Sequence, residues 1–87
     1  MITKEQALKL NSFFFRKHTN YRHRHPNADP IGEMRRNGQT KTWVRSPEKF
    51  CVPVKYGLYT YDYVTDRNAS EFFATREEAE NSLQESN

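Results

Sequence analysis

Residues 31–45 read IGEMRRNGQTKTWVR, and this stretch decides the fold that the sequence predicts. At its centre stands Asn37-Gly38, a pair that suits a two-residue β-hairpin turn, because both central residues of a type I′ turn need a positive φ. Residues on both sides alternate as strand residues do. We therefore predict a hairpin with strands at 31–36 and 39–45.

The register of this hairpin predicts which side chains share a face, because successive residues of a strand point to opposite sides. One face is expected to carry Met34, Arg36, Lys41, Trp43 and Arg45, and the other Ile31, Glu33, Arg35, Thr40, Thr42 and Val44. Two interpretations of Trp43 stay open. It is either a core residue with Lys41 and Arg45 around its rim, or an exposed stacking group between cations.

Further strands are expected after the hairpin. Residues 50–56 alternate in polarity, which predicts a half-buried strand, and Pro53 lacks an amide proton, which predicts that this strand lies at an edge or carries a bulge. Residues 58–64 alternate as well and form the next predicted strand. Residues 66–74 fit either a short strand or a helical turn.

A helix is predicted at each end of the chain. Thr3-x-x-Gln6 is a capping-box pattern that opens a helix over 4–17, and Thr75-x-x-Glu78 opens another over 76–84. Residues 19–30 show no apolar period and predict a loop rich in Arg and His. The expected fold is α+β in one domain, 1–87, with an N-terminal helix, an antiparallel meander of three to four strands and a short C-terminal helix.

Composition limits the class of protein. Apolar residues make up 34% of the 87 residues and aromatic residues 14%, which predicts a small core built largely of rings. The single cysteine cannot form an intramolecular disulfide, and no apolar run resembles a signal peptide or approaches the roughly 20 residues of a membrane span. We expect a cytoplasmic protein with no membrane partner.

Charge is distributed unevenly along the chain, although the net charge is only +3. Residues 1–55 hold twelve Lys and Arg against four Asp and Glu, whereas residues 56–87 hold two against seven. Such separation favours a basic face for an anionic partner. The alternative is two ordinary solvated surfaces.

Motifs for catalysis or cofactor binding are missing from the sequence. The three glycines fit no phosphate-binding loop, and Cys51 lacks the pattern of an activated nucleophile, so it is predicted to be a packing residue. His18, His23 and His25 are spaced poorly for zinc and stand among arginines. We expect no enzyme activity, no cofactor and no bound metal.

Binding is therefore the expected activity, and nucleic acid is the leading partner, with little sequence specificity. Cations supply phosphate contacts and rings supply base stacking. The predicted nucleic-acid-binding residues are Arg35, Arg36, Lys41, Trp43, Arg45, Lys55, Arg22 and Arg24. The alternative is a protein-protein inhibitor or adaptor that docks through Tyr59, Tyr61 and Tyr63.

A recurring motif of small bacteriophage proteins of uncharacterised function resembles the region from Arg35 to Phe72. The resemblance rests on Arg35-Arg36-Asn37-Gly38-Gln39-Thr40-Lys41-Thr42-Trp43, Pro47, Phe50, Val52-Pro53-Val54-Lys55-Tyr56-Gly57-Leu58, Tyr61 and Asn68-Ala69. It implies a phage accessory protein in the cytoplasm of an infected bacterial host. Nucleic acid or a host protein is its expected partner, and the protein is expected to be a monomer or a homodimer.

Overall fold

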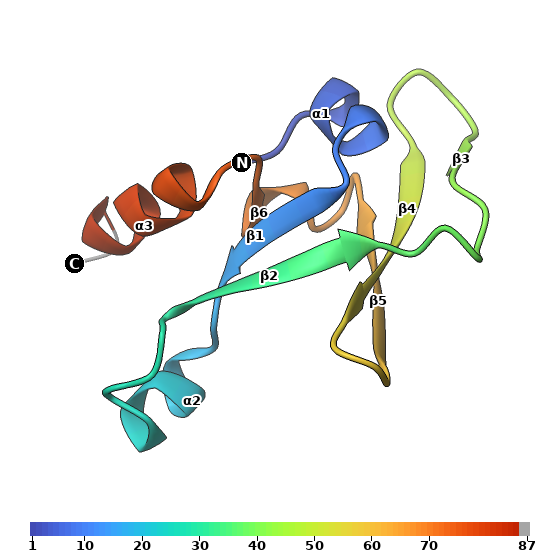
Figure 1. Cartoon of the computed structure of the whole chain (residues 1–87). Helices are drawn as coiled ribbons and strands as arrows, with labels where there is room; N and C mark the ends of the chain where they lie inside the picture. Colours follow the sequence, from blue (N-terminus) through green and yellow to red (C-terminus); the bar gives the residue numbers. More distant parts are fainter. Residues whose placement is uncertain (86–87) are drawn as a thin grey trace.

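The computed structural model describes residues 1–85 and joins six strands in one antiparallel sheet (Figure 1). The sheet order is β3-β4-β2-β1-β6, and β5 also pairs with β4. The elements, in chain order, are α1 (Lys4–Lys9), β1 (Ser12–Arg16), α2 (Thr19–Arg24), β2 (Ile31–Arg36), β3 (Trp43–Val44), β4 (Phe50–Tyr56), β5 (Thr60–Thr65), the short 3-10 helix η1 (Ala69–Glu71), β6 (Phe72–Phe73) and α3 (Arg76–Glu85).

The α+β class, the antiparallel sheet and the C-terminal helix are confirmed, and β3, β4 and β5 pair in chain order as a meander does. The predicted pairing of β2 with β3 and the count of three to four strands are wrong, because the sheet has six strands. β2 pairs with β4 rather than with β3, and β6 returns from late in the chain to pair with β1. Turn signals report only on neighbours in sequence, so these long-range pairings left no local pattern. Residues 66–74, which fitted strand or helix, contain both η1 and β6.

The first predicted helix is right only in its beginning. Thr3 and Gln6 form the expected capping box, but α1 ends at Lys9 and residues 12–16 form β1. In a strand, Phe13 points to one side of the sheet and Phe14 to the other, so the two rings reach different apolar clusters. In a helix, both rings would lie on one apolar stripe and could reach only one cluster. The Arg/His loop at 19–30 likewise contains the short helix α2.

The predicted hairpin at Asn37-Gly38 does not form. The chain does turn there, with the Thr40 amide donating to the Asn37 carbonyl at 3.3 Å and the Gln39 amide to Asn37 Oδ1 at 3.1 Å. Neither central residue of the predicted turn has a positive φ, so the type I′ geometry is absent. Residues 39–42 are consequently a loop, and the predicted strand 39–45 shrinks to β3.

Pro53 lies inside the sheet, so of the two predicted alternatives, an edge strand or a bulge, the edge strand is wrong. The Asn37 amide donates to the Pro53 carbonyl at 2.8 Å, and within a strand the nitrogen and carbonyl of one residue point the same way. The missing N–H therefore faces the interval between the β2 pairing at residues 54–55 and the β3 pairing at residues 50–51. A proline is tolerated here because the ladder is already interrupted.

Two apolar clusters lie on opposite faces of the sheet. The larger one includes Phe13, Val52, Val54 and Val64, each 0% exposed, and α1 covers it through Ala7. The smaller one lies beneath α3 and consists of Ile31, Phe73 and Ala79, with Phe14 and Leu83 packed against them. On its side of the sheet, α3 thus covers the part formed by β1, β2 and β6.

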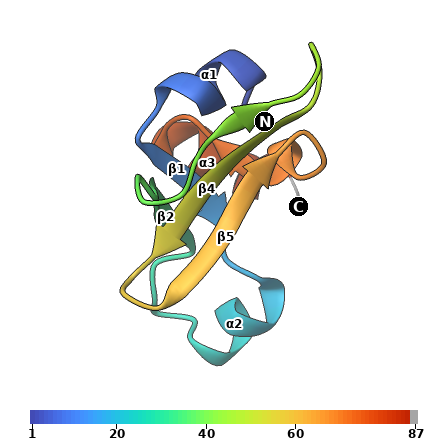
Figure 2. The same ribbon diagram turned by 90° about the vertical axis from the view of Figure 1, so that its right-hand side faces the viewer.

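The remaining part of that face has no helix over it. Figure 2 looks onto β4 and β5, and no helix lies in front of them. Among the described residues, no helix is long and apolar enough to cross a membrane.

Candidate nucleic-acid interface

The uncovered part of the sheet gathers cations and rings from three strands. Directly opposed residues of antiparallel strands point to the same side. Arg35 lies opposite Lys55, and Lys55 lies opposite Tyr61. The outer face is defined here by Arg35, Trp43, Lys55, Tyr61 and Tyr63, with Cys51 opposite Trp43 and Pro53 opposite Tyr63 as its floor.

The rings of the outer face are exposed. The exposed fraction is 40% for Trp43, 61% for Tyr61 and 51% for Tyr63, so the question about Trp43 is decided in favour of exposure. The floor beneath them is covered, and burial raises the pKa of the Cys51 thiol. A protonated, buried thiol is a poor nucleophile, in keeping with a packing role.

Cations flank these rings. The Arg45 guanidinium lies 4.6 Å from the centroid of the Trp43 ring, a cation–π contact that holds both side chains. Arg35 has one carboxylate neighbour, Glu33, on its own strand, with Nε 3.9 Å from Oε1. This exposed pair is long and therefore weak, so it leaves most of the Arg35 donors for a ligand.

Arg36 does not belong to the outer face, and its predicted position beside Trp43 is wrong. Its guanidinium donates to the carbonyls of Ala7 at 2.6 Å and Leu10 at 2.8 and 3.0 Å, and to the Thr42 hydroxyl at 3.0 Å. These bonds hold the end of α1 against the sheet. Arg36 points to the larger core, and its donors are used within the protein.

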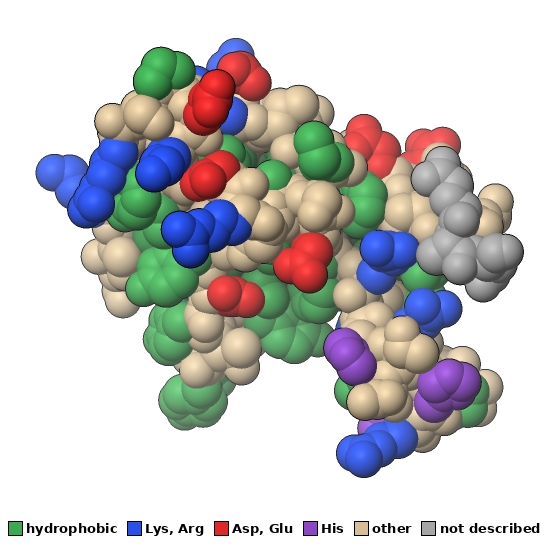
Figure 3. Space-filling model, turned by 180° about the vertical axis from the view of Figure 1, so that it is seen from behind, with side chains coloured by type: hydrophobic (Ala, Val, Ile, Leu, Met, Phe, Trp, Pro, Cys, Tyr) green, Lys and Arg blue, Asp and Glu red, His purple; other side chains and the backbone are tan. Residues whose placement is uncertain are grey.

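The other predicted cations are dispersed. Lys41 is exposed in the loop between β2 and β3. Arg22 and Arg24 lie on α2, at the other end of the molecule from β3 (Figure 1). In Figure 3, seen from behind, the blue and purple side chains of the lower right projection belong to this α2 region, and the green tip at the lower left is the turn between β4 and β5. The structure thus brings together Arg35, Trp43, Arg45 and Lys55, and separates them from Arg22 and Arg24.

A hollow of about 290 Å³ lies beside Tyr61 and Tyr63, which the sequence did not indicate. Its other walls are Asn37, Gln39, Thr40, Pro53, Val54 and Asp62. One signal was available: pairing residues 50–56 with 60–65 around Gly57 places Lys55 opposite Tyr61 and adds the tyrosines to the basic set. The sequence alone leaves the tyrosines open as a stacking surface, a protein-contact surface or the cover of a helix, and it does not join them to the basic hairpin.

Tyr59 lies apart from the other two tyrosines, at the tip of the β4–β5 turn. It is 87% exposed, and its neighbour Leu58 is 79% exposed. Gly57 supplies the positive φ of 67° that this turn needs. The tip is thus a small apolar projection outside the strands.

Metal ligands do not gather anywhere in the described part of the chain, where no three His, Cys, Asp or Glu residues are grouped to hold an ion. Comparisons with protein-family models, with curated proteins and with solved structures gave no match. The resemblance to bacteriophage proteins and the function therefore stay predictions.

Proposed function

We propose that this protein binds single-stranded nucleic acid through the outer face, without catalysis and with little sequence specificity, as an accessory protein of a bacteriophage. The observation that carries the proposal is the exposure of Trp43, Tyr61 and Tyr63 on the same side of the sheet as Arg35 and Lys55. Rings that stack on bases and cations that contact phosphates are the two components of sequence-tolerant single-strand binding.

The spacing of the rings supports single strands over duplexes. Tyr61 and Tyr63 are two residues apart on β5, or about 7 Å, so each ring can take one base of an extended strand. Bases in a duplex are already stacked and paired, and unstacking them costs free energy. The hollow beside these tyrosines offers amide and hydroxyl groups that can hydrogen-bond to a base edge.

The support beneath the rings also favours this role. The opposite side of β4 and β5 carries Val52, Val54 and Val64, which are fully buried. A packed core fixes the strands and thereby the spacing of the side chains that stand on them. Little ordering entropy is then lost when a ligand binds.

Trp43 gives a direct test, because it is the only tryptophan of the chain. Short single-stranded DNA and RNA should quench its fluorescence, and matching duplexes should do so less. Fluorescence anisotropy of labelled strands should give affinities that fall steeply with salt. Trp43→Ala should weaken single-strand binding by about 1–3 kcal/mol, the usual value of one stacked base.

A charge reversal provides the matched control. Arg35→Glu should weaken binding and reduce its salt dependence, whereas Arg24→Glu, at the other end of the molecule, should change binding much less. If micromolar single strands neither quench Trp43 nor bind at low salt, the proposal fails. Equal losses in the two arginine variants would point to general charge attraction rather than to the outer face.

Docking on a host protein is the second candidate, and the exposed tip of Leu58 and Tyr59 favours it. An apolar projection of this kind suits a pocket on a partner. Capture of a bacterial protein after nuclease treatment, lost in Leu58→Ser but kept in Trp43→Ala, would support this candidate. The reverse pattern would count against it.

A further inference from the structure

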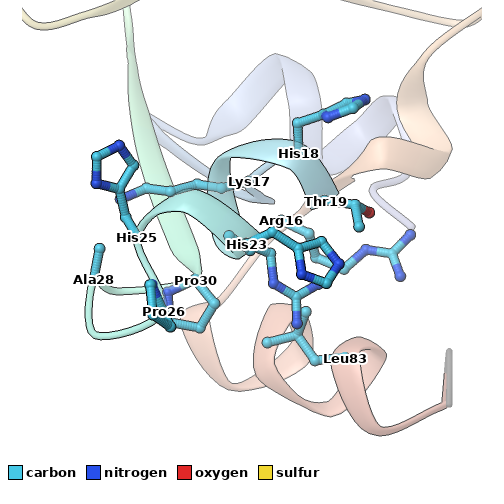
Figure 4. Close-up of a pocket in the computed structure, with 11 residues that line it drawn as sticks. Arg16, Lys17, His18, Thr19, His23, His25, Pro26, Ala28, Pro30 and Leu83 are labelled. Atoms are coloured by element: carbon cyan, nitrogen blue, oxygen red, sulfur yellow. The ribbon is translucent and has the colours of Figure 1, made fainter.

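A second hollow lies between α2 and α3, away from the outer face, and its volume is about 730 Å³. Pockets of several hundred Å³ are the usual size for small organic ligands. We call it the α2 pocket. Its lining residues are Arg16, Lys17, His18, Thr19, Arg22, His23, His25, Pro26, Ala28, Pro30 and Leu83 (Figure 4).

The charge of the α2 pocket is one-sided. Three Lys and Arg and three His line it, and none of its described lining residues is acidic. The nearby carboxylate of Asp29 is held by Arg76 at 2.6 Å, and the same guanidinium holds Glu80 at 2.7 Å. Arg76 balances only one of these two negative charges, and Lys17 also interacts with Asp29, but the three Lys and Arg of the lining still leave the pocket with an excess of positive charge.

Some of these cations are held in place by the protein itself. The Arg16 guanidinium donates to the Ser82 carbonyl at 3.4 Å, which connects β1 to α3. Lys17 Nζ lies 5.2 Å from the centroid of the Tyr21 ring, and that ring lies 4.6 Å from the His25 ring. Within the described residues, the side chains of Arg22 and His23 make no hydrogen bond, ion pair or ring contact, so they are the groups most ready to meet an anion.

His18 adds a donor of defined tautomer. Its Nδ1 accepts the Asn20 amide at 3.1 Å, so the neutral ring carries its proton on Nε2. Figure 4 shows His18 and His25 far apart, on different sides of α2. The imidazoles thus act as separate donors and do not converge as metal ligands would.

Part of the pocket wall is apolar. Pro26, Ala28 and Pro30 come from the loop after α2, and Leu83 comes from α3 across the hollow (Figure 4). A purely phosphate-binding cleft would not need this wall. A lining that combines cations with apolar carbon suits a ligand that joins a flat organic group to a phosphate.

We propose that the α2 pocket binds a nucleoside phosphate, with Arg22 and His23 on the phosphate and the proline–leucine wall against the base or sugar. The site is independent of the outer face, and it gives Arg22 a role different from that of Trp43 and Arg35.

The test is an NMR titration of the ¹⁵N-labelled protein with AMP, ATP, adenosine and inorganic phosphate as probes. AMP and ATP should shift the amides of residues 16–30 and of Leu83, with ATP the tighter. Adenosine and inorganic phosphate should each bind at least about tenfold more weakly than AMP, because each offers only one half of the ligand.

Two arginines of α2 supply a matched pair of variants. Arg22→Glu should weaken ATP binding by about tenfold or more, as expected for loss of a charged hydrogen bond. Arg24→Glu makes the same charge change on the same helix but lies outside the lining residues, so it should have little effect. His23→Gln is a second variant. It replaces a neutral imidazole by a neutral amide and should also weaken binding.

Three results would overturn the proposal. The first is no shift at residues 16–30 with millimolar ATP, and the second is equal weakening by the two arginine variants. The third is equal affinity for AMP and inorganic phosphate, which would remove the nucleoside from the assignment. Single-strand quenching of Trp43 should be retained in Arg22→Glu, so failure of this site and failure of the outer face are distinguishable.

Discussion

The outer face and the α2 region are both basic and both aromatic, but the protein supports them in different ways. Behind the outer face lies the larger core, where Val52, Val54 and Val64 are fully buried. No residue of α2 is buried. At the base of the α2 region, the Lys17 amide donates to the Pro30 carbonyl at 2.9 Å and so joins the two ends of the excursion. The Asp29–Arg76 ion pair attaches the region to α3.

This difference shows that similar residues can serve two kinds of surface. Side chains on a strand inherit their spacing from the ladder and from the core behind it. Side chains on an excursion such as residues 17–30 depend on a few polar contacts at its base. We therefore expect the outer face to be preformed and the α2 region to open locally while the sheet stays folded.

The largest expected contrast is in native-state hydrogen exchange. Amides in the centre of β4 should exchange only through global unfolding, about 5 kcal/mol or more for a stable domain. Amides of α2 should exchange through local opening at about 0–2 kcal/mol. Equal protection of α2 and β4 would contradict the comparison.

Next in size is the effect of Arg36, compared with its neighbour Arg35. Arg36→Met should lower the free energy of unfolding by about 1–3 kcal/mol, because half-buried carbonyls at the end of α1 lose their donors. Arg35→Met should change it by no more than about 0.5 kcal/mol, since Arg35 is exposed. Urea unfolding measures both, and equal losses would refute the assignment of separate roles.

A smaller effect concerns the free edge of β5, next to Tyr63. Asn68 Nδ2 donates to the Tyr63 carbonyl and Asn68 Oδ1 accepts from the Thr65 backbone amide, both at 2.8 Å. The Tyr63 backbone amide donates to Asp62 Oδ1 at 2.8 Å. These bonds occupy groups that would otherwise pair with another strand.

Asn68→Ala should therefore destabilise the fold by about 1 kcal/mol and promote dimerisation, measured by unfolding and sedimentation. Asn81→Ala, on the exposed side of α3, is the control and should change neither. A strictly monomeric Asn68→Ala protein would show that the edge is protected by other means.

The smallest expected effect is the pH dependence of the α2 region. The hydrogen bond from Arg76, followed by that from the Ile31 amide, lowers the pKa of Asp29 below its ordinary value of 3.8. Because the folded pKa is the lower one, the contribution of Asp29 is present above pH 3.8 and is lost as the pH falls through the folded value. Both partners are exposed, so the effect is confined to the attachment of residues 17–30 to α3.

Amide exchange of α2 should accordingly accelerate as the pH falls below about 4, after correction for intrinsic rates. Asp29→Asn should be fast already at neutral pH and should lose the additional acid dependence. Glu80→Gln, which removes the other partner of Arg76, should keep it. An unchanged pH profile in Asp29→Asn would contradict the role of this ion pair.

Local patterns predicted the elements that local interactions hold. β2 at 31–36 and β4 at 50–56 have the predicted bounds, and α3 begins at the predicted residue, with Thr75 Oγ1 accepting the Glu78 amide at 3.2 Å. Each of these segments carries its own alternation or cap. The Asn37-Gly38 pair misled for the same reason, because it signals a turn but not which strand β2 will pair with.

The candidate site was predicted in composition rather than in arrangement. Trp43, Arg45, Arg35 and Lys55 belonged to the predicted set, and all four gather at the outer face. Exchanging β4 for β3 as the partner of β2 put Arg35 instead of Arg36 beside the rings. It also made Tyr61 and Tyr63 members of the same surface.

By itself, the sequence determined the α+β class, the strands 31–36 and 50–56, the C-terminal helix and the concentration of cations in the first 55 residues. Capping, alternation and charge are encoded by residues close together in the chain. Only the tertiary structure decided that β2 pairs with β4, that residues 12–16 of the predicted helix form β1, and that Trp43 is exposed on the same face of the sheet as Arg35. Those outcomes depend on which strands and helices bury their apolar faces against each other. The burial joins segments that are far apart in sequence, so no local pattern reports it.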